Sequence, residues 1–300
     1  MAGDRSPDMN KQSANQGDRL KHALLLEVLE GTQAWPDVTY AETHAGSGIY
    51  RAKGQSAQKP DKQYIRLLRE EVERTHLVEG DNGPGAAYLR WLKEWWGSPS
   101  NDDTYYPGSA LTASRWLTGH RPPEQFEIRL TEGDKETCDD LRKALVIPED
   151  QVKQGSFDVY LDWLTETDNL VLLVDPFGIV TKFGESGACC GPERGQIDHD
   201  VVKKILDLCA HKERAVVHFW WSSAQGSKYY HAATTCLFEG WRGQQGAVTH
   251  RQFHDQHNHR STIFGIGTGA EIVDGLPGRK RWEKSWLKSV IYEKPRRRTK

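Results

Sequence analysis

The sequence lacks any uninterrupted apolar run of about 18 residues, the length that a membrane-spanning helix needs. Its first 18 residues are polar and hold no hydrophobic segment of the kind found in a secretory signal peptide. Only five cysteines occur, an odd number with no C-x-x-C spacing. We therefore expect no membrane span, signal peptide, disulfide framework or zinc ribbon, and we expect the chain to work in the reducing cytoplasm.

Two further kinds of site have weak or missing signals. The pattern G-x-x-x-x-G-K-[ST] is absent, which excludes a P-loop. Histidines at 250, 254, 257 and 259 form a cluster whose first three members have metal-ligand spacing on a helix. No acid or cysteine accompanies them at a recognisable spacing, so we interpret the segment as a polar loop and predict no metal. The glycines at 265, 267 and 269 are interpreted as a late strand and turn without a following helix.

Charge is distributed unevenly along the chain. The net charge is −2, but residues 279–300 hold ten Lys or Arg against two Glu, so this tail carries +8 and the remainder −10. The tail either meets phosphate groups or is a solvated, disordered end, and both interpretations stay open. The acidity of the remainder argues against a protein that binds nucleic acid by charge alone.

After a polar first segment, residues 1–14, which we expect to be disordered, strand and helix patterns alternate. This alternation predicts an α/β protein with a doubly wound, mostly parallel sheet. Strands are expected from residue 38 to 42 and at 126–131, 151–153, 170–174 and 215–221. Helices are expected from residue 15 and at 64–76, 86–96, 110–117, 135–144, 159–164 and 198–210.

Residues 51–104 interrupt that alternation with two consecutive helical patterns. They stand between the first strand and the next, so we interpret them as a helical insertion. Trp91 and Trp95 lie four residues apart on the second helix. We assign both to the core rather than to a surface on which nucleic-acid bases stack.

The first strand leads into the most informative pattern of the chain, Glu42-x-x-x-Gly46-x-Gly48. Glycine permits positive φ and places no Cβ between the backbone and a ligand, which suits a tight turn after a strand. An acid four residues before the first glycine is typical of S-adenosylmethionine (SAM) loops. The third glycine and closer spacing of dinucleotide-binding folds are missing.

Other candidate residues stand where elements begin or end. Asp18 is the expected cap of the first helix, with Lys21 and His22 in its first turn. Positive side chains there oppose the helix dipole, so they either lie in water or face a negative group. Ser109 occupies an expected N-cap position, from which its hydroxyl caps the helix or binds a ligand. Glu132 closes the second strand, where an acid commonly accepts hydrogen bonds from ribose hydroxyls.

Over about residues 15–290, these motifs resemble the RlmJ family, bacterial enzymes that methylate N6 of an adenine in large-subunit ribosomal RNA. The resemblance implies a class I SAM-dependent methyltransferase domain over 15–278, of Rossmann-like α/β fold, acting as a monomer on RNA rather than DNA. The segments that carry it are Asn15-Gln-Gly-Asp18-Arg-Leu20-Lys21-His22, Thr43-His44-Ala45-Gly46-Ser47-Gly48-Ile49-Tyr50, Tyr106-Pro107-Gly108-Ser109-Ala110-Leu111, Thr131-Glu132 and Asp175-Pro176.

The same resemblance assigns roles. Asp175 would be the catalytic acid-base residue, with the Pro176 carbonyl as a second acceptor and Phe177 as the stacking ring. Lys21 would contact the substrate. The SAM pocket would be lined by His22, Glu42, His44, Gly46, Gly48, Ser109, Glu132, Gly155 and Ser156.

One motif departs from the family. Its Asp-Pro-Pro-Tyr is Asp175-Pro176-Phe177-Gly178 here, so the aromatic residue at the fourth position is missing. Asp-Pro-Phe-Gly is similar to the motif of the three-Cys-motif partner proteins (TcmP), a methyltransferase-like family. Two alternatives therefore stay open: a methyltransferase of a protein or small molecule, and a catalytically silent SAM-fold protein that acts as a binding module or in defence.

Overall fold

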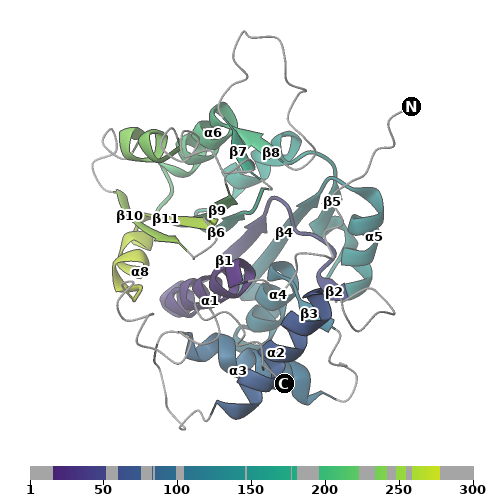
Figure 1. Cartoon of the computed structure of the whole chain (residues 1–300). Helices are drawn as coiled ribbons and strands as arrows, with labels where there is room; N and C mark the ends of the chain where they lie inside the picture. Colours follow the sequence, from purple (N-terminus) through teal and green to yellow (C-terminus); the bar gives the residue numbers. More distant parts are fainter. Residues whose placement is uncertain are drawn as a thin grey trace.

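A seven-stranded sheet forms the centre of the molecule (Figure 1). The computed structural model describes residues 16–51, 60–75, 83, 85–98, 105–145, 147–176, 178–180, 196–222, 234–241, 248–254 and 259–277. In spatial order the strands are β10 (Val248–His254), β11 (His259–Gly267), β9 (Arg214–Ser222), β6 (Asn169–Val174), β1 (Val38–Glu42), β4 (Phe126–Glu132) and β5 (Val152–Gln154). β11 pairs antiparallel with both β10 and β9, and the other neighbouring strands of this sheet pair parallel. This mostly parallel arrangement is the Rossmann-like α/β fold that the sequence predicted.

Helices cover both faces of this sheet, as Figure 1 shows. One face packs against α1 (Gln16–Gly31), α4 (Ser109–His120), α5 (Lys135–Ala144) and α8 (Gly269–Gly275). The other packs against the 3-10 helix η5 (Phe157–Glu166), α6 (His199–Cys209) and helical residues 234–241. Buried strand residues alternate between the two cores: Val171 and Leu173 of β6 face the first, and Leu170 and Leu172 the second.

The predicted helical insertion is present between β1 and β4. It contains α2 (Pro60–Arg74) and α3 (Ala86–Gly97), and it is bounded by the short strands β2 (Ile49–Arg51) and β3 (Tyr105–Pro107). These two strands pair with each other, antiparallel, outside the main sheet. The sequence did not predict that pair. Trp95 is buried and Trp91 half-buried, and both belong to the first core, as expected.

Two sequence interpretations were wrong. The histidine-rich segment is not wholly a loop, because His250 and His254 belong to β10 and His259 begins β11. Cross-strand pairing decided its structure, and a local pattern cannot show such pairing. Among the described residues, no three His, Cys, Asp or Glu side chains gather as a metal ion would require. The helix expected at 159–164 is part of the longer 3-10 helix η5.

Close packing explains why glycine occupies positions 265, 267 and 269. Gly267 has φ 56° and ends β11, and α8 follows it almost directly, contrary to our expectation that no helix would follow. A Cβ on Gly269 would collide with the carbonyl oxygen of Ala215, and one on Gly265 would lie 2.5 Å from the carbonyl oxygen of Gly269. The glycines therefore let α8 approach the backbone of β9 and β11.

Two short strands lie outside the main sheet in addition to β2 and β3. A separate pair of short parallel strands is formed by β7 (Gly178–Val180) and β8 (Gln196–Asp198). Among the described helices, none is long and apolar enough to cross a membrane. The predicted N-terminal extension (1–14), the basic tail (279–300) and Phe177 lie outside the described residues.

Replacing Gly269 with alanine should destabilise the protein by about 1 to 3 kcal/mol, because the added methyl group meets the β9 backbone. Gly275→Ala, in the same helix, is the matched control. It meets no atom within 4 Å and should be neutral or stabilising by about 0.4 to 1 kcal/mol. Urea unfolding of the two variants measures the difference. Equal stability of the two would show that the close approach of α8 is wrong.

Candidate active site

Three acids gather at the carboxyl edge of the sheet. Glu42 ends β1, Glu132 ends β4, and Asp175 directly follows β6. Because β4, β1 and β6 are neighbouring parallel strands, their carboxyl ends lie at one edge. The backbone N–H of Thr43 bonds the carbonyl of Leu173 across β1 and β6 at 3.1 Å. Glu42, Glu132 and Asp175 therefore share one edge of the sheet.

Asp175, which is half-buried, forms an ion pair with the buried Lys21. The Lys21 ammonium lies 2.5 Å from Asp175 Oδ2 and 3.4 Å from Asp18 Oδ1, and its side chain is 8% exposed. Burial opposes the charged form of Lys21, but Asp175 and Asp18 outweigh it and raise the ammonium pKa above its usual value. Lys21 therefore faces negative groups rather than water, which offsets its unfavourable position near the start of α1.

Glu42 is almost completely buried and holds two elements together. It accepts hydrogen bonds from the Tyr40 hydroxyl, at 2.7 Å, and from the Ser109 hydroxyl. Burial raises its pKa to about 7, the two hydrogen bonds oppose this rise, and nearby Asp175 adds to it. Ser109 is the first residue of α4, and Gly108 occupies the N-cap, so the expected capping role of Ser109 was wrong. Its hydroxyl instead ties α4 to β1.

The glycine turn is bonded to the end of β4. Gly46 and Gly48 have φ values of 63° and 73°, which agrees with the predicted need for glycine. The N–H of Gly46 donates to Glu132 Oε2 at 2.9 Å, and the N–H of Asp134 donates to Oε1 at 3.0 Å. Burial raises the pKa of Glu132, while these backbone donors oppose the rise. Glu132 thus fixes the shape of the turn.

Both predicted histidines are neutral. His22 Nδ1 lies 3.0 Å from the Tyr106 hydroxyl, and Tyr106 in turn lies 2.9 Å from the Tyr88 hydroxyl. Burial and then Lys21 lower the pKa of His22 well below its usual value. His44 Nδ1 bonds the Thr43 hydroxyl at 2.7 Å, and burial lowers its pKa to about 4. Neither imidazole therefore supplies positive charge near pH 7.

The remaining predicted residues lie at the same edge. The N–H of Gly155 donates to the carbonyl of Glu132 at 3.0 Å, and Ser156 is exposed. Pro176 is buried. Sequence reasoning missed the roles of Tyr40, Tyr106 and His218. His218 is buried on β9 with its Nε2 2.8 Å from the Ser261 hydroxyl, and only its isolated position in an apolar strand could have drawn attention to it.

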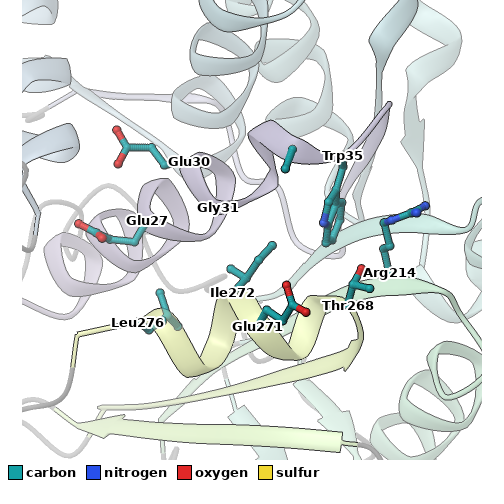
Figure 2. A pocket seen from close by; sticks show the side chains of 11 residues that line it. Glu27, Glu30, Gly31, Trp35, Arg214, Thr268, Glu271, Ile272 and Leu276 are labelled. Carbon is teal, nitrogen blue, oxygen red and sulfur yellow. The ribbon is translucent and has the colours of Figure 1, made fainter.

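A separate groove of about 560 Å³ lies at the opposite edge, where the parallel strands begin (Figure 2). It runs between the end of α1 and α8, and Trp35, Arg214 and Thr268 complete its wall. In Figure 2 Glu30 points away from α8, and Glu30 bonds Arg90 of α3. We call the sheet edge that holds Glu42, Glu132 and Asp175 the acidic edge. None of these residues lines the groove, so the size of the groove does not indicate where a reaction would occur.

Comparisons with known proteins bear on the fold. No family model matches the sequence, and no curated protein matches it. Protein LPL1258 from Legionella pneumophila str. Philadelphia 1, described with the family model DUF519, has a similar structure, with a TM-score of 0.58 and 16% identity over 93% of this chain and 94% of that one. The two chains share a fold. The similarity covers nearly the full length of both chains.

Two other solved structures are less similar. SMU.472 complexed with SAH has a TM-score of 0.33 and 15% identity, covering 77% of this chain and 48% of that one. The hMettl16 catalytic domain in complex with the MAT2A 3'UTR hairpin 1 has a TM-score of 0.32 and 15% identity, covering 69% of this chain and 81% of that one.

Glu42 should make stability depend on pH. Its folded pKa of about 7 exceeds the usual 4.5, so between these values the folded protein binds the extra proton and stability falls as pH rises. The wild-type free energy of unfolding should decline relative to that of Glu42→Gln by on the order of 3 kcal/mol between pH 4.5 and 8. Urea unfolding across this range tests it. Parallel curves for the two proteins would contradict the assignment.

Removing one partner of the Lys21–Asp175 pair should cost more than removing both. Lys21→Met removes this cation from the half-buried Asp175 carboxylate and should destabilise the protein by about 1 to 3 kcal/mol. The double variant Lys21→Met/Asp175→Asn should recover part of that loss. Lys143→Met breaks an exposed pair with Asp140 and should change stability little. If the destabilisation of the double variant equals the sum of those of Lys21→Met and Asp175→Asn, the two side chains do not act as a pair.

Proposed function

We propose that this protein is a SAM-dependent methyltransferase that N-methylates an exocyclic amine of a nucleic-acid base. The sequence resemblance favours adenine N6 of ribosomal RNA. The observation that carries the proposal is the position of Asp175, which follows the central strand β6 at the edge that holds the glycine turn and is paired with Lys21 at 2.5 Å. Ligands of open α/β sheets bind outside the carboxyl ends of the strands, which supports this location.

The groups around the glycine turn suit SAM. A carboxylate has about four lone-pair sites, so Glu132 can accept a ribose hydroxyl besides its backbone donors. The first turn of α4 presents backbone N–H groups that suit the methionine carboxylate. When bound, SAM supplies a methyl group on a positively charged sulfur. Asp18 and Asp175 outnumber the cation Lys21, with which both are paired, and this favours that positive charge.

Asp175 has a specific task in this proposal. The exocyclic amine of adenine is a weak nucleophile, because its lone pair is delocalised into the ring. An anionic Asp175 and the carbonyl oxygen of Pro176 accept hydrogen bonds from the two amine hydrogens and so orient the nitrogen lone pair. Lys21 keeps Asp175 anionic and in place. As the methyl group is transferred, the Asp175 carboxylate stabilises the positive charge that develops on the nitrogen.

A methyltransferase of another substrate class is the main alternative, because Gly178 stands where the resembled family has an aromatic residue. A base extruded from a nucleic acid needs an aromatic or apolar surface to stack on. A silent binding protein is the other alternative. Both alternatives keep the SAM-binding site and differ in the group that contacts Asp175. SAH binding and methyl transfer must therefore be measured separately.

Calorimetry with S-adenosylhomocysteine (SAH) should show one binding site on the wild-type protein. Glu132→Ala should weaken SAH affinity at least tenfold through the lost ribose contact.

Transfer from labelled SAM should reach RNA in preference to DNA or lysate protein. Asp175→Asn should lower transfer by about 10² to 10³-fold with little change in SAH affinity, since it acts on the amine. Nucleoside mass spectrometry identifies the modified base.

Asp140→Asn, an exposed acid on α5, is the matched control and should leave binding and transfer unchanged. Absence of SAH binding from both the wild type and a folded variant that lacks the Tyr50 side chain would refute the donor site. Binding with transfer only to protein or a small molecule would establish the first alternative. Binding with no transfer to any acceptor would establish the second.

A further inference from the structure

Tyr50 fills the space that two glycines leave open. It is the middle residue of β2 and pairs with Tyr106 of β3. A Cβ on Gly46 would collide with the Tyr50 hydroxyl, and a Cβ on Gly108 would lie 2.9 Å from ring carbon Cε2. The ring therefore lies against the glycine turn on one side and the start of α4 on the other. No side chain larger than hydrogen fits at either glycine while the ring is there.

Tyr50 also lies near the charged groups at the carboxyl edge of the sheet. Lys21, Asp18, Asp175 and Glu42 all act electrostatically on its hydroxyl. Burial and the carboxylates together outweigh Lys21 and raise its pKa, so the phenol is neutral. Tyr50 therefore lies against the glycine turn, near enough to Asp175 and Lys21 for their charges to act on its hydroxyl.

Among the described residues, the side chain of Tyr50 is held by packing against the first core and not by a hydrogen bond. Its hydroxyl makes no hydrogen bond to any residue that the structure describes, and the residue is only half-buried. The β2–β3 ladder that carries it has three residue pairs and is separate from the main sheet. Displacing the ring therefore costs its packing contacts but breaks no side-chain hydrogen bond among the described residues.

We propose that Tyr50 closes the donor pocket in the ligand-free protein and leaves it when the methyl donor binds. This inference rests on the proposed function, because the donor would run along the same glycine turn. Two groups cannot occupy one volume, so only molecules with Tyr50 displaced bind the donor. The apparent affinity is then reduced by the fraction of molecules in that state.

Calorimetry with SAH on the full chain tests this closure. Tyr50→Ala empties the space and should bind SAH at least threefold more tightly than the wild type. Tyr50→Phe removes only the hydroxyl that meets Gly46 and should shift affinity less, in the same direction. The matched control is Tyr105→Ala, on β3 and half-buried, which should bind as the wild type does. Thermal unfolding of each variant confirms that it is folded.

The outcomes separate this inference from the function on which it rests. Equal or weaker binding by folded Tyr50→Ala, with binding to the wild type intact, overturns the closure and leaves the donor site standing. Binding by Tyr50→Ala but not by the wild type supports both. Absence of binding from the wild type and both Tyr50 variants overturns both. If Tyr50→Ala does not fold, the direction of the Tyr50→Phe shift decides.

Discussion

The electrostatics of the sheet edge that holds Glu42, Glu132 and Asp175 depend on the ion pair between the buried Lys21 and the half-buried Asp175. Lys21 and Asp175 come from chain segments 154 residues apart, and their contact holds the first turns of α1 over the end of β6. Removing two charges from water is costly, and this cost is recovered only when both partners are in place. Neighbouring groups respond to the same charges: Asp175 adds to the raised pKa of Glu42, and Lys21 helps to keep His22 neutral. The acids, the ammonium and the imidazole therefore act as one electrostatic unit.

Hydrogen bonds from side chains join the elements around this unit. Glu42 links β1 to α4 through Ser109, and Glu132 links β4 to the glycine turn. Each carboxylate spans two elements that are far apart in sequence, so a change in either one alters the position of a whole helix or turn. The position of the glycine turn is therefore set by Glu132 as well as by the turn's own backbone conformation.

Much of this arrangement was predictable from local pattern. The apolar run of β6, the alternation of β4 and the spacing of α5 identified their elements, and parallel pairing then implied that Glu42, Glu132 and Asp175 share an edge. Contacts between distant segments were not predictable. Ser109 looked like a helix cap because capping is local, whereas its actual partner, Glu42, is 67 residues away. The strand pairing of His250 and the position of Tyr50 against Gly46 and Gly108 likewise depend on segments that come together only in the folded chain.

The place of α1 in the chain limits how far the protein can be trimmed. This helix precedes the first strand, yet it supplies the only cation paired with Asp175 among the described residues. A shorter fragment starting at Val38 would keep the glycine turn and every strand but would leave that carboxylate without its ammonium. The smallest unit that preserves the acidic edge must therefore include the helix before the sheet.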